Sequence, residues 1–164
     1  MGNGVGFRCE KCGYGFTAYL GVGFDFPEVY RETVSAVQEG EYGQEWKELF
    51  ERTPGAAVDA NRELYVCSAC GGYREDLNLT LYGPKDPGVS KVHDGQFSVA
   101  NPAEGAEYVA PWELGDEYRV VKVYRHMCAC GNRMHRLRVD DRLKCPWCRD
   151  GWMEFDPSGD MNWD

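Results

Sequence analysis

The sequence contains no isoleucine, and its 9 Leu, 15 Val and 7 Phe account for only 31 of 164 residues. An acidic chain with less than about 20% of these residues has little material for a large apolar core. It also lacks the apolar runs of a membrane protein and the glycine repeat of a collagen-like fibre. What it has instead is 22 Tyr, Trp and Phe and eight Cys. We therefore expect small modules held by metal rather than one large enzyme core.

The charge is distributed unevenly along the chain. The formal net charge is −9, yet residues 119–149 contain nine Lys and Arg against two Asp, a local charge of +7. A net acidic protein is not a general nucleic-acid binder. The asymmetry indicates either a solvated basic face or a contact between 119–149 and an acidic partner, which is another protein, a nucleic acid or the acidic part of the same chain. We expect Arg136 and Arg138 to be among the contact residues.

The first residues match neither a secretion signal nor a myristoylation site. Met1–Gly6 has neither the charged start nor the apolar run of a secretion signal. Gly6 also stands where a myristoylation site needs Ser or Thr. We therefore expect a cytoplasmic protein without a membrane partner. In that reducing compartment, eight Cys are expected to be metal ligands rather than disulfides.

Four close cysteine pairs predict two metal centres. The pairs are Cys9 and Cys12, Cys67 and Cys70, Cys128 and Cys130, and Cys145 and Cys148. A tight turn that presents two thiols supplies half of a tetrahedral zinc site. Gly13, Gly71 and Gly131 each follow a pair directly, where glycine allows backbone N–H groups to point at the sulfurs. Because four sulfur ligands leave no open position, zinc at such a site is structural.

Spacing favours pairing these turns in chain order. Cys130 and Cys145 are separated by 14 residues, the length of one hairpin. That arrangement leaves Cys12 and Cys67 to close a loop of 54 residues. Two zinc ions are predicted, with iron in one site as the alternative.

The third turn differs from the others. Cys128-Ala129-Cys130 is one residue tighter than the usual spacing of zinc ligands. His126 or His135 is therefore an alternative ligand for the second of the two sites.

The chain is predicted to contain two metal units and a connector. Residues 1–82 are expected to form a zinc-ribbon-like unit with a helical insertion, and 117–156 a compact C-terminal zinc ribbon. Four prolines and the lack of a sustained period predict an irregular connector over 83–116, and 157–164 is a loose acidic tail. The predicted fold class is α+β, with two small zinc-ribbon-like β units, the first carrying the helical segment.

Local signals predict two helices within 1–82. Asp25-Phe26-Pro27-Glu28 is typical of a helix start, and Gly40 can end that helix. Trp46, Leu49 and Phe50 share one side of a second helix over 43–52.

Strands are predicted from alternation and from neighbouring turns. Residues 64–66 form a strand that enters the second cysteine turn, and the leucines of 77–81 alternate with polar residues. Residues 118–127 read as a strand, and 134–144 as a hairpin around Asp140-Asp141.

The cysteine turns resemble those of known metal proteins. Phe7-Arg-Cys-Glu-Lys-Cys-Gly-Tyr14 is similar to the first metal loop of rubredoxins, and Cys145-Pro-Trp-Cys148 is similar to the second. Both clusters resemble zinc ribbons with rubredoxin-type knuckles, and the N-terminal half resembles uncharacterised bacterial zinc-ribbon proteins. The resemblance implies zinc and a fold but no activity. The chain departs from rubredoxins in its 54-residue gap and in pairing each rubredoxin-like loop with a dissimilar partner.

These observations predict a zinc-binding interaction module. Its basic C-terminal ribbon would contact another protein or a nucleic acid, and an exposed Trp147 could take part. The alternative is a rubredoxin-like electron carrier with iron in one four-cysteine site. The sequence offers no convergent His, Asp and Glu set that would support an enzyme, and His93-Asp94 is interpreted as a surface turn.

Overall fold

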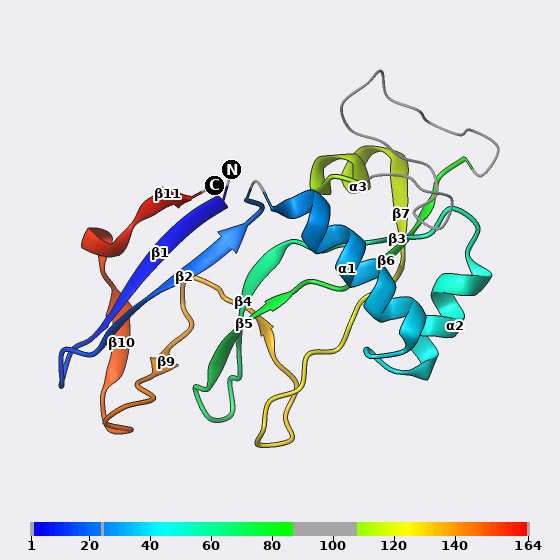
Figure 1. Cartoon of the computed structure of the whole chain (residues 1–164). Coiled ribbons are helices and arrows are strands. Elements are labelled where there is room, and N and C mark those ends of the chain that lie inside the picture. The colour runs from blue at the N-terminus through cyan, green and yellow to red at the C-terminus, as the bar shows by residue number, and fades with distance from the viewer. Residues whose placement is uncertain (1, 24, 87–107, 164) are drawn as a thin grey trace. The chain divides into compact units, whose positions relative to one another are not determined.

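The structure is a computed structural model that describes residues 2–23, 25–86 and 108–163. It contains two compact units whose segments alternate along the chain. Unit 1 comprises Met1–Phe24, Asn61–Leu77 and Arg125–Asp164, and unit 2 comprises Asp25–Ala60 and Asn78–Tyr124. The described residues form many strands and three α-helices (Figure 1), which confirms the α+β class.

Unit 1 is built on an eight-stranded antiparallel sheet. The strand order is β5-β4-β2-β1-β10-β9, with β8 paired to β4 and β11 paired to β1. The strands are β1 (Gly2–Cys9), β2 (Gly15–Gly21), β4 (Arg62–Val66), β5 (Tyr73–Leu77), β8 (His135–Arg136), β9 (Leu143–Lys144), β10 (Trp152–Phe155) and β11 (Met161–Trp163). The two ends of the chain thus meet in one sheet, because β1 pairs with both C-terminal strands β10 and β11.

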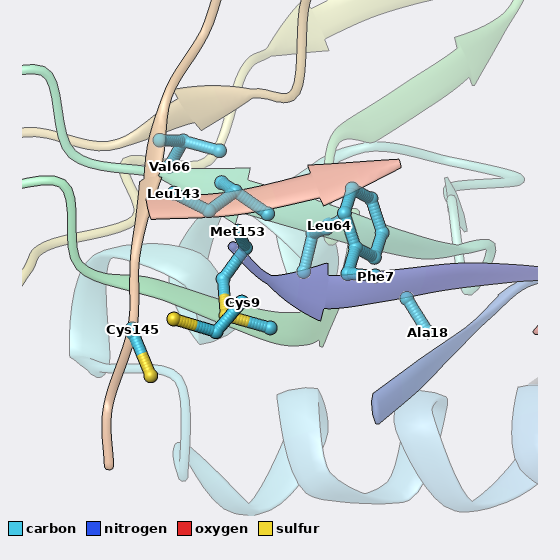
Figure 2. Close-up of a cluster of buried hydrophobic side chains, with 8 residues drawn as sticks. All are labelled: Phe7, Cys9, Ala18, Leu64, Val66, Leu143, Cys145 and Met153. Atoms are coloured by element: carbon cyan, nitrogen blue, oxygen red, sulfur yellow. The ribbon is translucent and has the colours of Figure 1, made fainter. Parts of the chain in front are cut away.

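The core of unit 1 includes ligand candidates among its apolar side chains. The buried cluster consists of Phe7, Cys9, Ala18, Leu64, Val66, Leu143, Cys145 and Met153. Figure 2 shows Cys9 and Cys145 together at one edge of this cluster. Side chains two residues apart on a strand share a face, so Phe7 and Cys9 both point into the core from β1. A metal centre at Cys9 would therefore extend the hydrophobic core.

Unit 2 contains the helices and a three-stranded sheet. The helices are α1 (Phe26–Glu39), α2 (Gln44–Arg52) and α3 (Pro111–Glu117), and the strands β3 (Ala57–Val58), β6 (Leu81–Pro84) and β7 (Tyr118–Lys122) run in the order β3-β6-β7. Gly40 ends α1 with a left-handed φ of 85°. The buried Trp46 of α2 donates its Nε1–H to the Leu79 carbonyl oxygen at 2.8 Å. Both predicted helices are confirmed.

The predicted strand through the leucines of 77–81 is wrong. β5 ends at Leu77 and β6 begins at Leu81. Between them, the Asn78 side-chain oxygen accepts the Thr80 N–H at 3.2 Å, and Leu79 has a left-handed φ of 62°. This local turn lies where the chain passes from unit 1 to unit 2, so the alternating leucines do not share a strand.

The predicted hairpin over 134–144 is also wrong. A turn is present, because the Asp141 N–H donates to the Arg138 carbonyl oxygen at 3.1 Å. However, β8 pairs with β4, and β9 pairs with β10. The two halves therefore belong to different parts of the sheet.

Several other boundaries differ from the sequence-based prediction. α3 and β6 lie within the predicted irregular connector 83–116, and the predicted strand 118–127 is shorter, as β7. The tail contains a 3₁₀ turn and β11, which pairs with β1. Both units are assembled from separated segments, so they do not coincide with the predicted stretches 1–82 and 117–156.

None of the helices in the described ranges is long and apolar enough to cross a lipid bilayer. The predicted surface turn His93-Asp94 lies outside the described residues.

Candidate metal centres

The eight predicted cysteines come together in two groups of four. The first group is Cys9, Cys12, Cys145 and Cys148, and the second group is Cys67, Cys70, Cys128 and Cys130. The sulfur atoms within each group all lie within 4.8 Å of one another. The second group is nested inside the first along the chain, so the chain-order pairing is wrong. Both groups lie in unit 1, and two separate ribbon units are not confirmed.

Strand pairing explains the first group. β1 ends at Cys9, which is in register with Met153 of β10. β10 also pairs with β9, and the Cys145–Cys148 turn connects these two strands. The register therefore brings the turn after β1 next to the turn between β9 and β10.

Strand pairing also explains the second group, which lies at the end of β4. β4 ends at Val66, which is in register with His135 of β8. Just before β8, an antiparallel bridge between Met127 and Arg133 closes the turn that carries Cys128 and Cys130. The turn after β4 and the turn before β8 therefore meet.

The sulfur geometry fits a tetrahedral metal ion. In the first group, Cys9 and Cys148 are 3.8 Å apart, and Cys12 and Cys145 are 3.7 Å apart. In the second group, the distances are 3.5 Å for Cys67 and Cys130 and 3.6 Å for Cys70 and Cys128. Zn–S bonds of about 2.3 Å in a tetrahedron place sulfurs about 3.8 Å apart. All eight thiols are free, so each group offers four soft ligands.

In all four cysteine turns, the residue directly after the second cysteine has a left-handed backbone conformation. Gly13, Gly71 and Gly131 have φ of 75°, 70° and 85°, as their predicted role requires. The N–H of each glycine donates to the carbonyl oxygen of the first cysteine of its pair, at 2.8–3.0 Å. In the fourth turn, Arg149 takes the same place with φ of 59°, and its N–H donates to the Cys145 carbonyl oxygen at 3.1 Å. Arg149 thus holds a left-handed position that favours glycine.

Hydrogen-bond donors reach the sulfurs and favour the thiolate form. The Asn132 side chain donates to Cys130 Sγ at 3.4 Å, and together with the Asn132 backbone it lowers the pKa of the Cys130 thiol to about 6. The backbone N–H groups of Asp150 and Gly151 lower the pKa of the Cys148 thiol to about 6. Thiolates are the species that bind metal, so each group contains one ligand prepared for it.

Two further glycines, Gly72 and Gly151, border the sulfurs. A Cβ on Gly151 would lie 2.6 Å from Cys9 Sγ, closer than any real contact. A Cβ on Gly72 would lie 3.2 Å from Cys70 Sγ and 3.6 Å from Cys128 Sγ. The size of the side chain is therefore restricted at the second residue after Cys70 and at the third residue after Cys148, and not only at the residue directly after a pair.

Neither candidate histidine belongs to a metal group. His126 is buried against the Tyr65 ring, with its Nδ1 3.3 Å from an Asp76 carboxylate oxygen. The Nε2 of His135 lies 2.9 Å from the Asp141 carboxylate, and its Nδ1 lies 3.4 Å from Ser68 Oγ. Cys128-Ala129-Cys130 supplies both of its thiols despite the tight spacing. The histidines instead connect the second group to neighbouring turns.

A groove of about 860 Å³ is lined by cysteines of both groups. Its other lining residues include three aromatic side chains, Tyr14, Phe16 and Tyr73, and three basic side chains, Arg74, Lys144 and Arg149. The Phe16 ring stacks on Tyr73, with 4.9 Å between ring centroids. The groove therefore combines flat apolar rings with positive charge.

The predicted basic stretch 119–149 is divided between the units. Arg119 and Lys122 belong to unit 2, where Lys122 pairs with Glu45. In unit 1, Arg136 pairs with Glu63, which leaves it less available to a partner. Unit 1 contains 11 basic and 11 acidic residues, whereas unit 2 carries the whole net charge of −9.

Searches of protein-family models, of curated proteins and of solved structures each found no match. The likeness to zinc ribbons thus rests on the two clusters of four cysteines at metal-binding distance.

Proposed function

We propose that this protein is a zinc-stabilised interaction module, in which two structural zinc ions hold unit 1 and its groove contacts a partner. The observation that carries the proposal is the pair of four-cysteine groups, whose sulfur spacing matches a tetrahedral zinc ion. Such sites are closed to substrate, so zinc would act on the fold rather than on a reaction.

Each zinc ion would join two separated segments of unit 1. The first group links Met1–Phe24 to Arg125–Asp164, and the second group links Asn61–Leu77 to Arg125–Asp164. Structural zinc contributes about 10–16 kcal/mol per site in small zinc domains. That is enough to assemble three segments around a small core.

The surface of the first group supports an interaction role. Trp147, between two of its ligands, has 76% of its surface exposed. Exposed tryptophan is uncommon on ordinary surfaces and is enriched where proteins bind partners. We therefore propose the groove and the neighbouring Trp147 as the partner contact, in place of the whole stretch 119–149.

Metal analysis of the purified full chain tests the zinc assignment. We expect close to two zinc ions per chain and no visible colour, together with broadened NMR signals from unit 1 after chelation. One zinc ion per chain, or an unchanged spectrum after its removal, would contradict the proposal.

A second candidate function is electron transfer with iron in the first group. It is favoured by one observation: the first group joins Phe7–Tyr14 to Cys145–Cys148, the two loops that resemble the two metal loops of rubredoxins. Iron in four thiolates is coloured and can change oxidation state, whereas zinc cannot. A red protein with one iron per chain and a reversible reduction would support this candidate, and a colourless two-zinc protein would exclude it.

A further inference from the structure

We propose that the groove of unit 1 binds single-stranded nucleic acid, an inference that rests on the interaction function proposed above. Bases would stack on the aromatic side chains in and beside the groove, and phosphates would contact its basic side chains. Proteins that bind single strands without sequence preference combine these two features.

The aromatic surface suits the flat faces of unpaired bases. The Tyr14 and Trp147 rings are parallel within 2°, with 6.4 Å between their centroids. Tyr14 lines the groove, and Trp147 is largely exposed. A base laid on the open face of Trp147 would extend this stack outward from the groove. Stacking of this kind tolerates any base, because every base has a flat π face.

Basic side chains outnumber acidic side chains in the groove lining, before the −2 of each zinc-loaded cysteine group is added. Arg74, Lys144 and Arg149 face one acidic residue, Glu75, whose carboxylate already accepts the Tyr19 N–H at 3.0 Å. The Arg74 guanidinium also forms an ion pair with Asp76, with 3.0 Å between a guanidinium nitrogen and a carboxylate oxygen. Within the described part of the chain, Arg149 forms no ion pair, so its guanidinium is available to a phosphate.

The backbone at Arg149 is a second, independent sign of a role for this side chain. Left-handed φ is unfavourable for a residue with a Cβ, and the equivalent residue in the other three turns is glycine. Glycine at this position would be the more stable choice. Strained residues concentrate at functional sites, where the side chain is needed.

A single strand fits these features better than the other acidic ligands. An acidic peptide would use the basic side chains but gain little from the parallel rings. A duplex keeps its base faces covered, so stacking on Trp147 is closed to it. Each zinc with four thiolates carries −2, which weakens purely electrostatic binding and leaves stacking as the main attraction.

Fluorescence anisotropy on the zinc-loaded full chain tests the proposal. The probe is a labelled oligothymidine of about 12 nucleotides, within the site sizes known for single-strand binders. We expect a Kd of about 1–100 μM at about 50 mM salt. Three phosphate contacts predict a slope of about −2 in log K against log salt, so binding should weaken about 15-fold at about 200 mM. A duplex of the same length should bind more weakly.

Two variants locate the site. Arg149→Gly should weaken binding about 5- to 10-fold and leave the protein at least as stable, because it removes a charged contact and relieves the backbone. Trp147→Ala should weaken binding about fivefold or more. Arg138→Gln and Trp112→Ala are matched controls at exposed residues outside the groove lining, and should keep the wild-type Kd within about twofold.

Other results would overturn the proposal. Absence of oligothymidine binding, or equal losses in the control variants, would refute the groove as the site. Competition by oligoglutamate as strong as that by unlabelled oligothymidine would make the occupant an acidic peptide. A two-zinc protein that fails to bind refutes only this inference. Binding that depends on Arg149 and Trp147 in a protein without zinc refutes only the zinc-stabilised module.

Discussion

Loss of zinc should unfold unit 1 and leave the helices of unit 2 folded. All eight cysteines lie in unit 1, whereas α1, α2 and α3 lie in unit 2. Unit 2 has its own buried core, which includes Tyr30, Val37, Trp46 and Phe50. The metal therefore has no direct part in holding the helices.

The free energy that one zinc ion contributes predicts that unit 1 unfolds completely when a single site is lost. Zinc contributes about 10–16 kcal/mol per structural site, and a whole domain is stable by only about 5–15 kcal/mol. Two of the eight side chains in the main buried cluster of unit 1, Cys9 and Cys145, are themselves ligand candidates. The free energy lost with either ion should thus exceed the free energy of unfolding of unit 1.

Two ligand variants provide the perturbation, one for each group. Cys145→Ser should remove the ion of the first group, and Cys67→Ser that of the second. Ala69→Ser, at an exposed residue in the same turn as Cys67, is the control for an added hydroxyl. Amide NMR should show collapse of unit 1 signals in both ligand variants, while far-UV circular dichroism keeps its helical signal.

The outcome separates the observed grouping from pairing in chain order. If Cys9 and Cys12 shared a metal with Cys67 and Cys70, α1 and α2 would lie inside the closed loop. Cys67→Ser would then remove the helices and Cys145→Ser would spare them. Equal loss of helix in both variants would show that the units fold as one, and would refute the independence argued above.

Three smaller changes test local features. Gly151→Ala should cost one zinc ion per chain in metal analysis, because its Cβ would lie 2.6 Å from Cys9 Sγ, whereas Gly115→Ala, with open space around its Cβ, should keep both ions. Trp46→Phe should lower the free energy of unfolding by about 1–3 kcal/mol in urea, because a buried carbonyl loses its donor; an unchanged midpoint would contradict this. Arg149→Gly should raise the free energy of unfolding by about 1 kcal/mol, and a lower value would show that the side chain supports the fold.

Features encoded by neighbouring residues could be predicted from the sequence. The first helix follows from Pro27 near its start and Gly40 at its end, both of which act within one turn of the chain. The left-handed glycines after three cysteine pairs follow from the tight turn itself. All eight ligand candidates were identified for the same reason, because the two thiols of each pair are close in sequence.

Features that depend on distant partners could not be predicted in this way. The turn between β8 and β9 is predictable from Asp140-Asp141, but a hairpin requires the two strands to pair with each other, and each has another partner. Leu77, Leu79 and Leu81 alternate in sequence, yet the chain changes units between them. Alternation shows which residues are buried and does not show which strand they join.

The grouping of the cysteines shows how weak an argument from loop length is. Chain-order pairing closes loops of 54 and 14 residues, and the observed grouping closes loops of 57 and 132. Because each doubling of a loop costs only about 0.6 kcal/mol, the longer loops cost about 2 kcal/mol more in total. A single zinc site contributes several times as much, so either grouping could form. The register of β1 with β10 and of β4 with β8 decides between them. It also unites the two loops that resemble those of rubredoxins, so in this chain likeness between turns is a better guide to shared metal than distance along the sequence.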